Sequence, residues 1–229
     1  MKKSLSYFFN LFYPRTCVCC EEVLLDQEEL MCLDCRFDLP LVDNGDYHLN
    51  AVTKIFEGRV LVEKGASFMY YQEKGKTKQL IHELKYKNNQ KIGYFLACWF
   101  GNELIESKRF HGFDCIIPVP LHKRKFKKRG YNQLTVFGRQ LGVLLAVDYR
   151  EDLLKRVSFT NTQTKKKRLD RFQNTHAKFV LEKPNFLRNK HILLIDDVVT
   201  TGATLEACCK ELLSIDQVKI SILTMAISG

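Results

Sequence analysis

Apolar residues recur along this chain at two spacings, one typical of buried strands and one typical of amphipathic helices. The run from Ile192 to Ile195 has the length and branching of a parallel strand buried on both faces. Apolar side chains then return every three or four positions over residues 203–213, which predicts a helix. A strand, a polar turn and a helix in this order aim backbone N–H groups and the positive end of the helix at an anion.

The same two spacings predict further elements before and after this unit. Strands are expected at residues 68–71, 114–121, 179–181 and 218–227, and helices at 77–86, 94–105 and 133–145. Pro118 and Pro120 end the second of these strands, since proline cannot continue a hydrogen-bonded ladder. A turn is expected at Pro184. His82 and Lys85 lie opposite the apolar face of the 77–86 helix, so we expect both to be solvated.

The polar turn after Ile195 combines two acids with hydroxyl groups and a glycine. Carboxylates repel a phosphate but accept hydrogen bonds from vicinal hydroxyls, so the pattern favours a sugar phosphate, with its diol on the acids and its phosphate in the turn. The alternative is a solvated turn in which one acid or threonine caps the helix. The predicted binding residues are Asp196, Asp197, Val198, Val199, Thr200, Thr201, Gly202, Ala203 and Thr204.

A basic stretch follows the strand at 114–121. Residues 122–133 contain six lysines and arginines and no acid, and ligands of open α/β sheets bind in loops at the carboxyl ends of strands. Taken alone, such a basic stretch is equally compatible with solvated surface and with an anion-binding site. Its occurrence together with the acidic turn favours the binding site. The chain carries a net charge of +10, which also suggests an anionic partner. A second basic segment, residues 160–174, is expected to be a mobile lid over that anion.

Four cysteines near the start of the chain form two Cys-x-x-Cys pairs. Such pairs complete a tetrahedral site of four thiolates for a structural Zn²⁺, and redox chemistry is the competing interpretation. Because Cys19 and Cys20 are adjacent, the sequence leaves open which of the two is the ligand. The predicted metal ligands are Cys17, Cys20, Cys32 and Cys35.

The start of the chain has a short apolar stretch after two lysines. Leu5, Phe8 and Phe12 recur at helical spacing, which favours a short amphipathic helix over a signal peptide. No apolar run approaches the roughly 18 residues of a membrane span, so we expect no membrane partner and a cytoplasmic location. The apolar pattern lapses between residues 38 and 50, which suggests an N-terminal module at 1–48 and a main domain at 49–229.

The polar turn resembles the loop of type I phosphoribosyltransferases that binds phosphoribosyl pyrophosphate (PRPP). The order of the Cys-x-x-Cys pairs, Pro118-Val-Pro-Leu, Arg129-Gly-Tyr-Asn-Gln and the acidic turn resembles the ComF family across essentially the whole chain. This resemblance implies an α/β type I phosphoribosyltransferase fold, a parallel sheet flanked by helices, with a small N-terminal zinc-ribbon module. It also implies a role in natural competence, handling incoming single-stranded DNA, in some species with a competence helicase.

Residue roles follow from the same resemblance. Asp196 and Asp197 match the acids that hold the ribose and are the expected catalytic residues, and Thr200 to Thr204 match the phosphate cradle. Mg²⁺ is expected to bind together with PRPP, and the phosphoribosyl acceptor cannot be identified. The alternative function is a single-stranded-DNA-binding module whose PRPP pocket is regulatory or vestigial. Residues expected to contact pyrophosphate or DNA are Arg124, Lys127, Arg129, Lys166 and Arg168.

Overall fold

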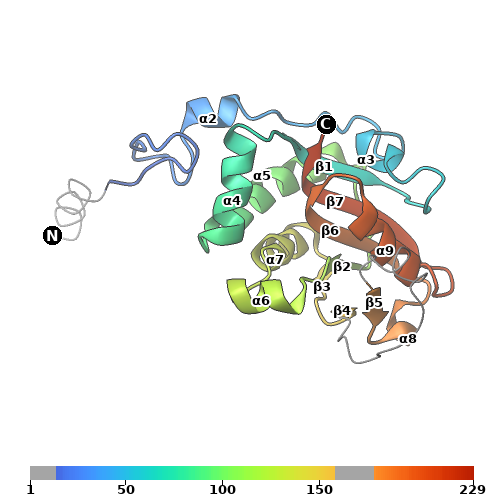
Figure 1. Cartoon of the computed structure of the whole chain (residues 1–229). Helices are drawn as coiled ribbons and strands as arrows, with labels where there is room; N and C mark the ends of the chain where they lie inside the picture. The colour runs from blue at the N-terminus through green and yellow to red at the C-terminus, as the bar shows by residue number, and fades with distance from the viewer. Residues whose placement is uncertain (1–13, 158–177) are drawn as a thin grey trace.

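The computed structural model describes residues 14–157 and 178–229, which form one sheet with helices on both faces and a cysteine-rich N-terminal segment (Figure 1). The predicted N-terminal amphipathic helix and the predicted lid lie outside the described residues. Lys166 and Arg168 lie there too, so their predicted contacts stay predictions.

The main sheet has five parallel strands in the order β1-β7-β6-β2-β3. The predicted strands are all present, and β6 and β7 are the longest because their side chains are buried over almost their whole length. The strands are β1 Gly65–Tyr71, β2 Cys115–Pro118, β3 Asp148–Tyr149, β6 His191–Val199 and β7 Lys219–Ser228.

The chain reverses its direction of travel across the sheet between β2 and β6. It passes from β2 through α7 to β3 in one direction, and from β6 through α9 to β7 in the other. Because such crossovers are right-handed, the two helices cover opposite faces, and the carboxyl ends of β2 and β6 mark the switch point at which open α/β sheets bind ligands. The helices are α4 Lys76–Tyr86, α5 Lys91–Ser107, α7 Leu134–Leu145 and α9 Ala203–Leu212 (Figure 1).

The basic stretch after β2 is helical, so its prediction as a loop was wrong. Helix α6, Lys123–Arg129, begins where the His122 ring accepts the backbone N–H of Arg124, and it ends at Gly130 in the left-handed conformation. Lysine and arginine are good helix formers, and a cap at each end is enough to stabilise this short helix. A second short helix, α8 Pro184–Leu187, replaces the predicted turn.

A two-stranded antiparallel hairpin stands beside the sheet. Strand β4, Leu154–Val157, pairs with β5, Lys178–Leu181, and the two flank residues 158–177. Strand β5 was predicted, whereas β4 lacks an apolar pattern strong enough to mark it.

The N-terminal segment contacts the sheet through residues on either side of the expected module boundary. Helix α2, Leu33–Phe37, follows Cys32, and the Val42 N–H then donates to the Phe68 carbonyl of β1 at 3.0 Å. A further short helix, α3 Ala51–Lys54, packs on β1 and β7. The boundary at residue 48 stays a prediction. Within the described ranges, none of the helices is both long and apolar enough to cross a membrane.

Candidate functional site

The polar turn lies at the carboxyl end of β6, where it encloses a small cavity. Gly202 adopts φ +73°, a left-handed conformation that favours glycine, and α9 begins at the next residue without a side-chain cap. The unpaired N–H groups of a first helical turn attract anions. The cavity, called here the loop cavity, has a volume of about 70 Å³ and is lined by Asp196 and residues 198–205.

Residues from the segment after α3 hold this turn from outside. A Cβ at Gly202 would lie 2.5 Å from a methyl carbon of Ile55 and 3.0 Å from the Phe56 ring, so the two segments touch closely. Arg59 donates to the Thr201 carbonyl at 2.8 Å and pairs with Glu206 on α9. No sequence motif marks Arg59, because it lies 142 residues from its partner in the turn.

Asp197 is buried in contacts with two side chains from other elements. It is 6% exposed, and its carboxylate pairs with Lys85 of α4 at 2.7 Å and accepts from the Gln133 amide at 2.5 Å. The prediction that Lys85 is solvated was therefore wrong. Lys85 follows the buried Leu84 at the edge of the apolar face of α4, where its long side chain can reach across to β6.

Asp196 lies beside the loop cavity and forms no ion pair with any of the described residues. It keeps some exposed surface there, and its carboxylate accepts the backbone N–H of Asp197 at 2.8 Å. Burial of its carboxyl group, and then the neighbouring charge of Asp197, raise the pKa of Asp196 to about 8. The two acids therefore differ: Asp197 is already paired, whereas Asp196 is open to a ligand in the loop cavity.

Gln133 links Asp197 to the basic helix. Its side-chain oxygen accepts from Arg129 at 2.7 Å, and the Arg129 guanidinium lies 5.1 Å from the centre of the Tyr86 ring. Arg129 was predicted to contact pyrophosphate; in the structure it joins α6 to α4 and to the buried acid. Gln133 ends the Arg129-Gly-Tyr-Asn-Gln motif, but that motif does not show its contact with Asp197, and Lys85 belongs to none of the motifs noted in the sequence.

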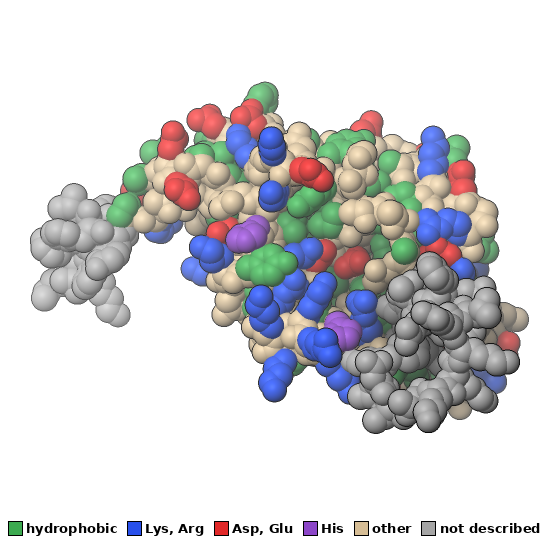
Figure 2. All heavy atoms as spheres, in the orientation of Figure 1, with side chains coloured by type: hydrophobic (Ala, Val, Ile, Leu, Met, Phe, Trp, Pro, Cys, Tyr) green, Lys and Arg blue, Asp and Glu red, His purple; other side chains and the backbone are tan. Residues whose placement is uncertain are grey.

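The other basic residues of α6 are exposed, and Figure 2 shows lysine and arginine side chains gathered on this face. Arg124 forms no ion pair among the described residues, and Lys127 lines a separate, larger cavity. The loop cavity is thus lined by one acid and the turn itself, with the cations of α6 outside its lining.

The four predicted cysteine ligands come together at the start of the chain. Their sulfur atoms all lie within 4.8 Å of one another, and those of Cys20 and Cys32 are 3.7 Å apart. Thiolates bound tetrahedrally to zinc at about 2.3 Å lie about 3.8 Å apart, so the group fits a zinc ion. The Cys19 sulfur instead lies 4.0 Å from the Lys76 carbonyl.

Backbone groups favour thiolate formation at one member of this cluster, Cys17, whereas burial raises the pKa of Cys32 and Cys35. Burial opposes ionisation of Cys17, but N–H groups of Cys32 and Cys19 donate to its sulfur at 3.4 Å, and its pKa falls to about 7. Metal ligation requires a thiolate, and these contacts make one available near neutral pH.

Comparisons with known proteins agree with this architecture. The family model of the phosphoribosyl transferase domain matches residues 122–226. Competence protein F of Haemophilus influenzae is 33% identical over 147 residues, which span 62% of this chain and 64% of that protein. DNA utilization protein YhgH of Escherichia coli K12 is 31% identical over 137 residues, which span 58% of this chain and 60% of that protein.

Among solved structures, the adenine phosphoribosyltransferase of Saccharomyces cerevisiae is similar at 17% identity and a TM-score of 0.39, covering 62% of this chain and 72% of that one. The chain spans less than two thirds of the length of the two curated relatives above. The two curated relatives and the phosphoribosyl transferase family model support a ComF-family assignment for this chain.

Proposed function

We propose that this protein binds PRPP at the end of β6. The observation that carries the proposal is the loop cavity, because it joins an uncapped helix start and a left-handed glycine to an acid that forms no ion pair within residues 14–157 and 178–229. The 5-phosphate would accept from the N–H groups of residues 200–204 and from the hydroxyls of Thr200, Thr201 and Thr204. The ribose hydroxyls would donate to Asp196.

The two acids have different roles in this proposal. Asp196 contacts the ribose directly, whereas Asp197, held by Lys85 and Gln133, fixes the end of β6 and adds negative charge beside the ribose. Mg²⁺ would arrive with PRPP on the oxygen atoms of the ligand and neutralise part of its charge. If transfer occurs, the bond from ribose C1 to pyrophosphate breaks, a bond from C1 to the acceptor forms, and pyrophosphate leaves.

The names of the relatives suggest where this chemistry is used. One is called a competence protein and another a DNA utilization protein, so we place this protein in DNA uptake in the bacterial cytoplasm, with a competence helicase as a partner in some species. The cysteine cluster would hold a structural Zn²⁺, because it offers four thiols and no open position.

Isothermal titration of the zinc-loaded protein with PRPP and Mg²⁺ tests this proposal. Wild type should bind saturably, and Asp196→Asn should weaken binding at least about tenfold by removing a charged acceptor. Asp148→Asn is the control, since Asp148 is an exposed acid on β3 outside the loop cavity. Absence of PRPP binding to folded wild type would reject the proposal. Binding would justify a screen for acceptors by pyrophosphate release.

The second proposed function is binding of single-stranded DNA by the basic face. The exposed lysines and arginines of α6 favour it, since phosphate contacts dominate such binding. Affinity should then fall steeply with salt, by roughly 0.7 log units per tenfold change in salt for each contacted phosphate. A salt-independent affinity would exclude backbone binding. Competition between PRPP and DNA would indicate that both contact the same basic side chains.

A further inference from the structure

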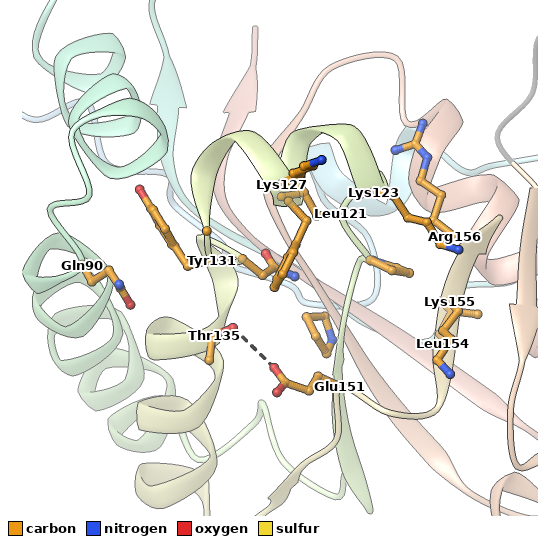
Figure 3. Close-up of a pocket in the computed structure, with 15 residues that line it drawn as sticks. Gln90, Leu121, Lys123, Lys127, Tyr131, Thr135, Glu151, Leu154, Lys155 and Arg156 are labelled. Carbon is orange, nitrogen blue, oxygen red and sulfur yellow. Dashed lines mark hydrogen bonds between the residues drawn. The ribbon is translucent and has the colours of Figure 1, made fainter. Parts of the chain in front are cut away.

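A second cavity lies at the carboxyl end of β2, and among the described residues Lys127 is the one in its lining that was predicted to contact pyrophosphate or DNA. It has a volume of about 810 Å³, within the range of small-molecule sites, and shares no lining residue with the loop cavity. Helix α6, the start of α7 and strand β4 surround it (Figure 3). We call it the large cavity.

Much of the wall of the large cavity is apolar and built of flat or rigid groups. Pro118 and Pro120 line it at the end of β2, Leu154 lines it from β4, and the Phe126 and Tyr131 rings line it from α6 and the following turn. The Tyr131 hydroxyl donates to the Leu84 carbonyl, which fixes its ring in place. Rings and prolines in this arrangement suit a flat heterocycle, which gains stacking energy from such walls.

Cations gather at one side of this cavity. In Figure 3, Lys123 and Lys127 of α6 and Arg156 of β4 lie on the same side of the pocket. The two lysines are one helical turn apart and repel each other, and neither forms an ion pair among the described residues. Lys155 is already paired with Glu182. An anion placed between the three cations would relieve their repulsion, and a phosphate is the simplest such anion.

An acid occupies the opposite side. Figure 3 shows Glu151 directed toward Thr135, whose hydroxyl donates to it at 3.4 Å. Its other contacts, the Tyr149 hydroxyl at 3.3 Å and Arg139 at 3.5 Å, are also long, and its side chain is 49% exposed. Glu151 therefore keeps acceptor capacity for N–H donors on a ligand, while it repels phosphate from its own end of the cavity.

We propose that the large cavity binds a nucleoside phosphate whose base carries adjacent N–H donors, with guanine as the best match. The phosphate would lie between Lys123, Lys127 and Arg156, the base would stack on Phe126, and its two neighbouring N–H groups would donate to Glu151. A thymine offers one N–H between two carbonyl oxygens, which a carboxylate repels. The ligand can be a free nucleotide or one residue of a single strand, because both present the same chemistry.

Titration of the full-length, zinc-loaded protein with dGMP and with dTMP tests this site. Wild type should prefer dGMP by about tenfold or more, the discrimination expected of one bidentate contact to a base. Glu151→Gln should remove the preference with little change in dTMP affinity, because the amide cannot accept both N–H groups. Lys123→Met/Lys127→Met should weaken both nucleotides. The control is Lys125→Met, an exposed residue of the same helix outside the cavity lining.

Saturating PRPP and the Asp196→Asn variant separate this site from the proposed PRPP site. The preference for dGMP should persist in both, so its presence or absence is decided independently of PRPP binding. An oligonucleotide with a single guanine that binds more tightly than dGMP, with loss in Glu151→Gln, would identify a strand as the source. Absence of saturable dGMP binding, or an unchanged preference in Glu151→Gln, would overturn the proposal. So would an equal loss of affinity in Lys125→Met.

Discussion

The ends of β6 and β2 are neighbours on one edge of the sheet, yet they form two different kinds of cavity. The end of β6 encloses about 70 Å³ with consecutive residues and is held by side chains packed against its backbone. The end of β2 opens into about 810 Å³ lined by residues from several separate elements, with exposed cations around it. The first suits one defined group, and the second suits a larger ligand with two unlike ends.

This contrast determines how each region should respond to mutation. In the turn after β6, the backbone conformation is what binds the ligand, so a small steric change there should strongly reduce affinity. Around the large cavity, individual side chains are the recognising features, so backbone changes should matter less than changes of charge.

The largest effect on stability and on PRPP affinity is expected from substitution of Gly202 in the turn after β6. Gly202→Ala should lower the free energy of unfolding by about 3 kcal/mol, because the new Cβ meets Ile55 at 2.5 Å and alanine disfavours the left-handed backbone. PRPP affinity should fall at least about tenfold with it. Denaturant unfolding and titration measure both effects.

Gly130→Ala is the matched control. Gly130 has φ +78°, but a Cβ added there would meet nothing within 4 Å, so only the backbone cost of about 1 kcal/mol remains. Equal destabilisation of the two variants would contradict the proposed bracing of the turn by Ile55 and Phe56.

Much of the fold could be predicted from the sequence, because each strand and helix has its own spacing of apolar residues within one continuous segment. The end of β6 was recognisable for the same reason: its acids, threonines and glycine follow one another. Lys85 and Arg59 could not be found in this way, and neither could the contact of Gln133 with Asp197, since each depends on packing between distant segments. Helix α6 was missed because six cations in twelve residues show no apolar period, although lysine and arginine are good helix formers and the helix has a cap at each end.

The next largest effect is expected at the buried acid beside the turn. Lys85→Met should lower the free energy of unfolding by about 2–3 kcal/mol, because Asp197 loses its counter-ion while it stays buried. PRPP affinity should also fall, since an unpaired Asp197 disturbs Asp196. Lys87→Met, at an exposed position just after α4, should change neither quantity. Wild-type stability in Lys85→Met would show that the ion pair contributes nothing.

A pH effect should follow from Asp196. Because its pKa is raised to about 8, the ligand-free protein holds a proton there at neutral pH, and only the ionised carboxylate accepts from both ribose hydroxyls. PRPP affinity should therefore rise by up to about tenfold per pH unit below pH 8 and level off above it. The phosphates of PRPP, with a second pKa of about 6, contribute little in that range.

Stability should change with pH in the opposite direction. The raised pKa of Asp196 favours the folded protein most at low pH, and this contribution is lost as pH rises from about 4 through 8. Asp196→Asn should flatten both profiles. A binding profile that is already flat in wild type would mean that Asp196 is not the group that accepts the ribose.

The smallest effect is expected from the arginine behind the turn. Arg59→Met removes the hydrogen bond to the Thr201 carbonyl at 2.8 Å and the pairing with Glu206, both partly exposed to solvent. Such contacts contribute about 1 kcal/mol to stability, so the free energy of unfolding should fall by about that amount and PRPP affinity by no more than about fivefold. Arg188→Met is the control, since Arg188 is an exposed arginine three residues before the start of β6, at the end of that strand opposite the turn. Because Arg59 holds a carbonyl and not a ligand, its loss should leave the dGMP preference of the large cavity unchanged. A loss of both PRPP affinity and dGMP preference in Arg59→Met would mean that the loop cavity and the large cavity act as one site.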